Sequence, residues 1–154
     1  MPVTSLNELI PVLQTAVGPM ILISGVGLFL LTMTNRMGRV VDRSRLLKAQ
    51  LPTADEAARA VIEAQLTVFL VRGRLLRAAI TLISISALIA ATLIIFLFFS
   101  ALFQLRDAWL IGTLFVASMI GLCISLLLFI KDVNLSLEAL KFELQMEKTD
   151  IEAP

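Results

Sequence analysis

The chain has 154 residues, of which 58% are hydrophobic and 16% charged, whereas an ordinary soluble domain has about 45–50% apolar and about 25% charged residues. It contains no histidine and a single cysteine, Cys123, which excludes histidine-based zinc sites and catalytic triads and any intrachain disulfide framework. The net charge of +1 says little, but the charges are absent from three long windows and crowded between and after them.

The three uncharged windows span residues 9–35, 78–105 and 108–130. A helix rises about 1.5 Å per residue, so about 20 apolar residues cross the hydrocarbon core of a bilayer, and each window is long enough. The pattern predicts an all-α integral membrane protein with three transmembrane helices in a single membrane domain, residues 1–154. We expect the first window to be retained as a span, because no Lys or Arg precedes it and it is too long for a signal peptide.

The basic residues predict the orientation of the spans. Nine Lys or Arg residues lie between the first two windows, and none precedes the first. Because short cation-rich loops stay in the cytoplasm, we expect the N-terminus outside and the C-terminus in the cytoplasm. The outer connection around residues 104–107 is short, so the second and third spans should form an antiparallel hairpin, with Phe103 and Trp109 as interfacial anchors.

Residues 36–77 are predicted to form a long cytoplasmic helical hairpin. The first helix should continue from the membrane to a break at Pro52, and Thr53 and Glu56 stand at the spacing of a capping box for the next helix. The predicted apolar arc of the first helix consists of Met37, Val40, Val41, Ser44 and Leu47. The stripe expected to dock on it consists of Val61, Ala64, Val68, Val71 and Leu75.

The polar residues of this hairpin nearest the spans are the candidate site for anions, lipid or a pore vestibule: Asn35, Arg36, Arg39, Asp42, Arg43, Arg45, Arg72, Arg74 and Arg77. Three interpretations stay open. The arginines can act as topological anchors that attract anionic lipid. Arg36, Arg39 and Arg43, which share one face, can surround an axis or bind a phosphate-bearing ligand or partner. They can also form salt bridges, with Asp42 placed to pair with Arg39 or Arg45.

Residues 131–154 are predicted to form a cytoplasmic amphipathic helix with two apolar faces. One face contains Val133, Leu137, Leu140 and Leu144, and the other contains Leu135, Ala139, Phe142 and Met146. We expect one face to pack on the hairpin, and the other is available for a neighbouring subunit.

The third span carries small residues at steps of four, which predict a helix-packing seam: Thr113, Ala117, Gly121 and Ser125. No window has a charged residue at its middle, where proton relays and ion-coupled transporters usually need one. We expect no cofactor and no metal.

Two segments carry a resemblance to a known family. They are Pro19 to Leu28 followed by Thr34-Asn35-Arg36-Met37-Gly38-Arg39-Val40-Val41-Asp42-Arg43-Ser44-Arg45, and Arg72-Gly73-Arg74-Leu75-Leu76-Arg77. With them the chain resembles, over nearly its whole length, the uncharacterised bacterial membrane-protein family known as domain of unknown function 2721. The resemblance implies three spans and a bacterial origin, hence the inner membrane, and it implies no activity.

Two functions remain open. The first is a homo-oligomer that encloses an ion-conducting pore with a basic cytoplasmic vestibule. The alternative is a non-catalytic scaffold or accessory subunit that binds a partner protein or anionic lipid through its hairpin. We expect no enzyme, because Asp42, Glu56 and Glu63 are explained by helix pairing or capping, and no nucleic-acid binding, because the basic segment lacks interleaved aromatic residues.

Overall fold

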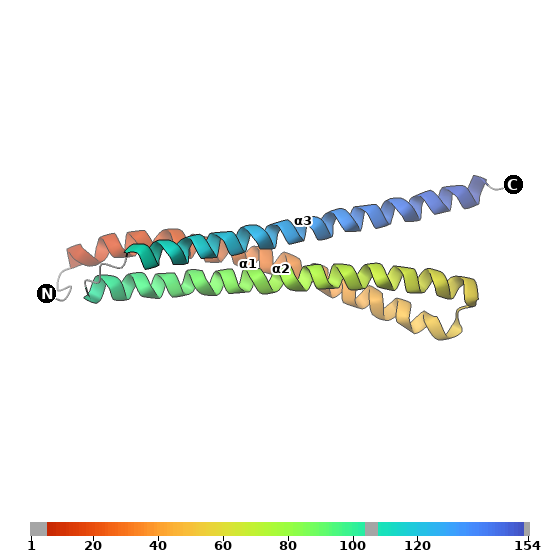
Figure 1. Cartoon of the computed structure of the whole chain (residues 1–154), viewed down its shortest axis with the longest axis horizontal. Helices are drawn as coiled ribbons and strands as arrows, with labels where there is room; N and C mark the ends of the chain where they lie inside the picture. The colour runs from red at the N-terminus through yellow and green to blue at the C-terminus, as the bar shows by residue number, and fades with distance from the viewer. Residues whose placement is uncertain (1–5, 104–107, 153–154) are drawn as a thin grey trace. The chain divides into compact units, whose positions relative to one another are not determined.

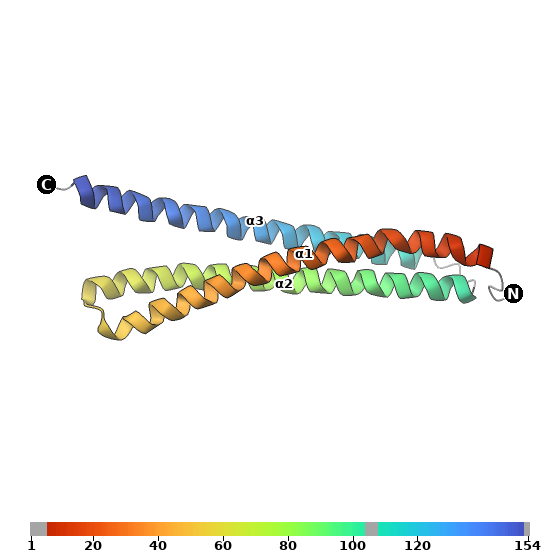
Figure 2. The ribbon, with the colours of Figure 1, turned by 180° about the vertical axis from the view of Figure 1, so that it is seen from behind.

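Three long helices make up the structure, a computed structural model that describes residues 6–103 and 108–152, without the side chains of 6–9, 12, 15 and 138–152. They are α1 (Leu6–Gln50), α2 (Glu56–Phe103) and α3 (Ala108–Glu152), and a short 3₁₀ turn, Leu51–Thr53, joins α1 to α2 (Figures 1 and 2). The described residues contain no strand. All three helices include segments long and apolar enough to cross a membrane, so the chain has the elements of a multi-pass membrane protein.

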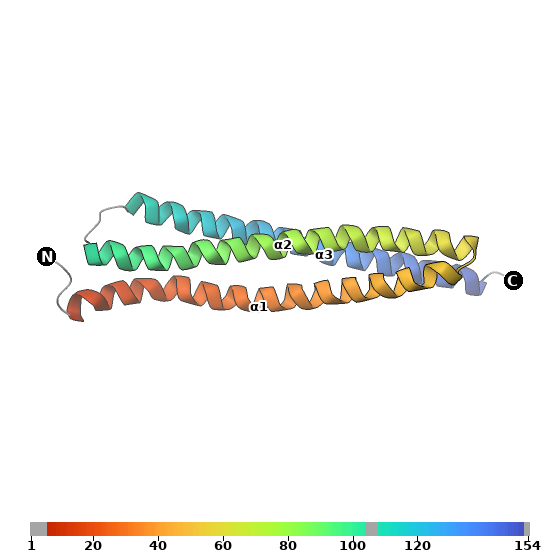
Figure 3. The same cartoon turned by 90° about the horizontal axis from the view of Figure 1, so that it is seen from below.

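The helices run without interruption from the predicted spans into the predicted hairpin and tail (Figure 3). By their internal contacts the residues group into two units, which are described separately. The apolar unit consists of residues up to 32 and 80–125, and the basic unit consists of 33–79 and the residues from 126. The predicted outer connection, residues 104–107, lies outside the described residues.

In the apolar unit, α2 and α3 pack closely through small residues. The Ser118 hydroxyl donates to the backbone carbonyl of Ser86 at 3.0 Å, and the Ser86 hydroxyl donates in return to the carbonyl of Ser118. A Cβ added to Gly121 would lie 3.3 Å from the Ser86 Cβ, so glycine permits the approach. Within this unit the two helices are therefore antiparallel neighbours, joined by direct hydrogen bonds between serine hydroxyls and backbone carbonyls.

The predicted seam divides along α3. Gly121 faces Ser86, and Ser125 is fully buried. Thr113 and Ala117 are exposed and lie beside Trp109 along an open hollow of about 540 Å³. The buried positions of α3 in this unit are Ser118 and Ser125, seven residues apart, so the contact face is rotated away from Thr113 and Ala117.

The same seven-residue spacing occurs on the other helices. On α1 the buried side chains include Val26, Met33, Val40 and Leu47. On α2 they include Leu76, Ala79, Ile83, Ser86, Ala90 and Leu93, at alternating steps of three and four. A 3.5-residue period is typical of left-handed supercoiled helices, whose side chains pack as knobs into holes.

In the basic unit, the predicted arc of α1 is confirmed, because Val40 and Leu47 are buried and the other three residues are partly buried. The predicted stripe on α2 is wrong. Val61 is 50% exposed and Val71 44% exposed, while Ile62, Leu76 and Ala79 are buried. The predicted stripe and the buried residues both follow a spacing of three and four, on adjacent faces of α2. The buried face is the one that continues along the helix to Ile83 and Ala90.

The predicted capping box is also wrong. The Thr53 hydroxyl donates back to the carbonyl of Gln50 at 3.1 Å, at the end of the 3₁₀ turn. The cap of α2 is Asp55, whose Oδ1 accepts from the backbone N–H of Ala58 at 2.9 Å. An Asp before the first helical residue satisfies an otherwise unpaired N–H, and here it leaves Glu56 in the first turn.

Replacement of Gly121 by valine should destabilise the apolar unit. The added side chain meets Ser86 at the tightest described glycine contact, and overpacking of this kind costs about 1–3 kcal/mol. The matched control is Gly112→Val on the same helix, where an added Cβ meets nothing within 4 Å. Thermal unfolding of both variants in detergent should show a lower Tm for Gly121→Val alone, and equal melting would contradict the close approach.

Candidate functional site

The basic unit has a buried carboxylate at its centre. Asp132, on α3, is fully buried. Its Oδ1 accepts a hydrogen bond from Nε of Arg72 on α2 at 3.2 Å, and its Oδ2 lies 3.4 Å from Nη2 of Arg36 on α1. Each of the three helices therefore contributes one residue to this charged cluster, which we call the triad.

Burial makes the triad interdependent. A carboxylate removed from water loses its hydration and is stable only if paired and hydrogen-bonded. The two arginine side chains are themselves only 21% and 12% exposed. Oδ2 accepts no hydrogen bond from any described residue. Among these residues, the positive charge of Arg36 at 3.4 Å is what compensates the negative charge at Oδ2.

Two aromatic rings also contact the guanidinium groups of the triad. The Arg36 guanidinium lies over the ring of Phe129 at 5.2 Å from its centroid, and that of Arg72 lies over Phe69 at 5.8 Å. Cation–π contacts of this kind favour the charged group over the ring face. Each of the two arginines thus contacts both the carboxylate and an aromatic ring.

Next to the triad lies a pocket of about 460 Å³, which we call the arginine pocket. Four of its seven lining residues are arginines and one is a serine: Arg36, Arg39, Val40, Arg43, Phe69, Arg72 and Ser136. The three arginines of α1 are at helical spacing, so they present one face. No acidic side chain of the described residues lines the pocket, which makes it suited to an anion.

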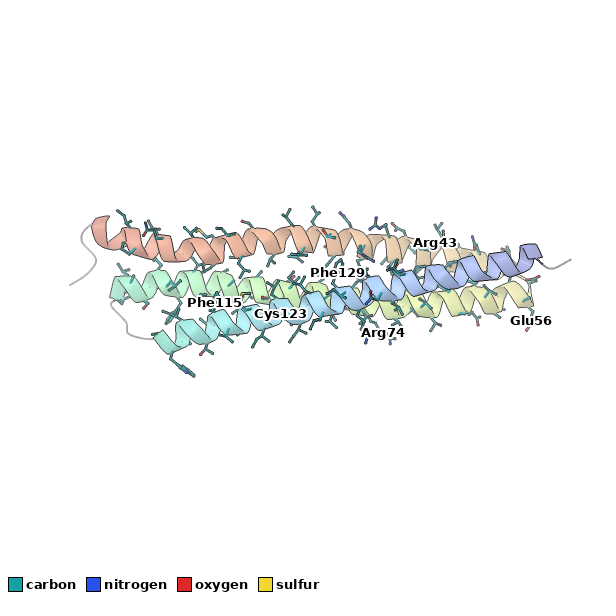
Figure 4. All side chains as sticks on the ribbon, turned by 90° about the horizontal axis from the view of Figure 1, so that it is seen from above. Arg43, Glu56, Arg74, Phe115, Cys123 and Phe129 are labelled. Atoms are coloured by element: carbon teal, nitrogen blue, oxygen red, sulfur yellow. The ribbon has the colours of Figure 1, made fainter. Side chains whose placement is uncertain are left out.

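A second, more apolar groove lies between α1 and α2 and has a volume of about 530 Å³. Its cationic residues are Arg45, Lys48, Arg74 and Arg77. Val40 and Phe69 line both hollows, and Val40 is buried, so these two side chains separate the groove from the arginine pocket. Figure 4 shows Arg43 on α1 and Arg74 on α2 projecting in different directions.

The other predicted site residues are at the surface. Asn35, Asp42, Arg45 and Arg74 are exposed and lie outside the triad and the arginine pocket. Asp42 forms no ion pair with Arg39 or Arg45, although the sequence placed it within reach of both. Among the described residues, the acid that pairs with the predicted arginines is Asp132.

Asp132 is not among the predicted site residues, because it lies two positions after the third apolar window and belongs to the predicted tail. Two signals could have identified it. It lies seven residues after Ser125 and fourteen after Ser118, on the packing face of α3. It also lies just after the third apolar window. Arg36 likewise follows the first window, and Arg72 to Arg77 precede the second, so antiparallel packing of the helices brings these charges to one level.

The described residues contain no group of three His, Cys, Asp or Glu side chains that could hold a metal ion. Cys123 is exposed on α3 (Figure 4). The arginines of the site can offer an anion electrostatic attraction and hydrogen-bond donors.

Comparison with protein families gives one result: the model described as Protein of unknown function (DUF2721) matches residues 16–142. The match includes the triad and every residue of the arginine pocket. Comparisons with curated proteins and with solved structures give no match.

Replacement of Asp132 by alanine should strongly destabilise the chain. The change leaves Arg36 and Arg72 poorly hydrated and without their shared counter-ion, and loss of one partner from a buried pair costs about 3–5 kcal/mol. The free energy of unfolding in detergent, measured by chemical denaturation, checks this.

The matched control is Glu63→Ala, which breaks the exposed pair with Arg59, whose side chains are 63% and 60% exposed. An exposed i,i+4 pair contributes about 0.3–0.5 kcal/mol. Equal effects of the two substitutions would show that the triad contributes no more than a surface ion pair.

Proposed function

The chain belongs to the DUF2721 family of unknown function, and we propose that it is a non-catalytic membrane scaffold that holds anionic lipid at the cytoplasmic surface of the bacterial inner membrane. In this proposal the N-terminus is outside, and the hairpin and the C-terminus are in the cytoplasm. The observation that carries it is the arginine pocket, where four arginines line one hollow and the nearby triad supplies a single carboxylate.

The charge distribution supports the orientation. Between residues 36 and 48 and between 72 and 77 there are eight Lys or Arg residues and one acid, Asp42. The other acids of the hairpin, Asp55, Glu56 and Glu63, lie at or near its tip. Cations are thus concentrated beside the apolar windows, which is the arrangement that keeps a short segment in the cytoplasm.

The same distribution supports lipid binding. The cytoplasmic leaflet carries anionic headgroups, and each Lys or Arg near it contributes about 1 kcal/mol of attraction. Arg39 and Arg43 are exposed, and the Asp132 carboxylate is already paired with Arg36 and Arg72. Arg39 and Arg43 are therefore available to the phosphate groups of lipids.

A pore is the weaker proposal. Three helices are too few to enclose an aqueous path, so a pore needs several copies around an axis. The triad and the arginine pocket are built from one chain and need no second copy. The proposal includes no catalytic role.

The proposed orientation predicts where the tip of the hairpin reacts. Thr53 is exposed in the 3₁₀ turn, so Thr53→Cys in a Cys123→Ser background gives a single accessible thiol. In intact cells a membrane-impermeant maleimide should not label it, and in inverted membrane vesicles it should. Labelling in intact cells would overturn the topology.

Lipid binding predicts a preference that depends on the arginines near the spans. Native mass spectrometry of the purified protein should retain phosphatidylglycerol over phosphatidylcholine, less so at high salt because exposed charges are screened. A variant with Arg39, Arg43, Arg45 and Arg74 all changed to Gln should lose the preference.

Arg59→Gln is the control for this measurement. Residue 59 lies 19 positions before the second apolar window, about 28 Å along a helix, and already pairs with Glu63, so its loss should leave the preference unchanged. An unchanged preference in the fourfold variant would contradict the proposed function.

A further inference from the structure

We propose that the arginine pocket is a discrete binding site for a phosphate-bearing anion that carries at least two negative charges, with one ligand per chain. This inference rests on the proposed function and makes it specific: it gives the basic surface one saturable site with a defined chemistry. The ligand class is a phosphate monoester or a molecule with two phosphates, either as a lipid headgroup or in free form.

The charge of the pocket sets the valence of its ligand. Among the described side chains, the four arginines contribute +4 and the neighbouring Asp132 contributes −1, which leaves +3 around this hollow. A single phosphodiester carries one negative charge, whereas a phosphate monoester carries about 1.5 to 2 at neutral pH. A monoester, or two phosphates in one molecule, compensates this charge better than one phosphodiester.

The donors are arranged for oxygen anions. A guanidinium has five N–H groups in a planar fork that matches the oxygens of phosphate. Arg72 uses its Nε on Asp132, and Arg36 lies against Asp132 through one Nη, so each has further N–H groups to direct at a ligand. Ser136 adds a hydroxyl to the same wall.

The triad prepares two of these donors before a ligand arrives. Asp132 and the rings of Phe129 and Phe69 hold the guanidinium groups of Arg36 and Arg72 in fixed places. Fixed donors lose less conformational freedom on binding than mobile surface side chains do. Asp132 is thus a positioning residue, while the exposed side chains of Arg39 and Arg43 bind the ligand directly.

The size of the pocket agrees with this ligand class. A hollow of about 460 Å³ falls within the roughly 300–1,000 Å³ usual for small-molecule sites, which is more than a halide ion needs. Basic pockets between helices at the cytoplasmic surface are suited to polyvalent lipid headgroups.

The test compares two double variants that remove the same charge. Arg39→Gln with Arg43→Gln removes two arginines of the pocket, and Arg45→Gln with Arg74→Gln removes two outside it. All four side chains are exposed and none belongs to the triad, so both variants should fold like the wild type, which thermal unfolding verifies.

The full-length protein in phosphatidylcholine nanodiscs is titrated with three probes: phosphatidic acid, phosphatidylglycerol and inorganic pyrophosphate. We expect one phosphatidic acid per chain, bound more tightly than phosphatidylglycerol. The pocket variant should bind it about tenfold more weakly than the control variant does, because it loses directed, charge-assisted hydrogen bonds and not only diffuse attraction.

The outcomes distinguish a lipid ligand from a free anion, and they distinguish failure of the pocket from failure of the proposed function. Saturable binding of phosphatidic acid alone indicates a lipid, and saturable binding of pyrophosphate with the same dependence on the pocket indicates a free anion; both support the site. Equal losses in the two variants would overturn the pocket and leave general anionic-lipid binding intact. A protein that binds none of the three probes would overturn both proposals.

Discussion

Asp132 places a carboxylate out of contact with solvent, and two guanidinium groups from two other helices compensate its charge. The cost of burying an unpaired charge is high enough that the three helices of the basic unit must keep one axial and rotational register at this level. That register brings Arg36, Arg39 and Arg43 of α1 to the same hollow as Arg72 of α2. The pocket is therefore a consequence of how the carboxylate is neutralised.

Apolar side chains of similar volume could fill the space of the triad with equal or greater stability. What the charged residues add is two guanidinium planes held at the wall of a pocket, against the rings of Phe129 and Phe69. The unit thus has two kinds of arginine: Arg36 and Arg72 belong to the triad and are partly buried, whereas Arg39 and Arg43 are exposed and lie outside the triad. The proposed binding can thus be tested at Arg39 and Arg43 without removal of a residue of the triad.

In the apolar unit, a different interaction sets the packing. Lipid is as apolar as the side chains, so helices in a bilayer gain little by excluding it and associate through close contact and hydrogen bonds. Ser86, Ser118 and Gly121 provide both, with reciprocal hydroxyl-to-carbonyl bonds and a short approach. Large apolar residues such as Leu28, Leu88 and Ile120 remain exposed, as expected for surfaces that contact lipid.

The sequence by itself determined the three apolar helices, the break at Pro52 and the concentration of arginines beside the spans, because length, charge and proline act locally. It also predicted the apolar arc of α1, since Val40 and Leu47 recur with the helical period. Only the tertiary structure decided which face of α2 is buried. The pair Val61 and Val68 and the pair Ile62 and Phe69 have the same seven-residue spacing, so the two faces differ only in what they contact. It alone assigned Asp132 to Arg36 and Arg72, since that pairing joins residues 60 or more positions apart, and chain-local patterns carry no information about such partners.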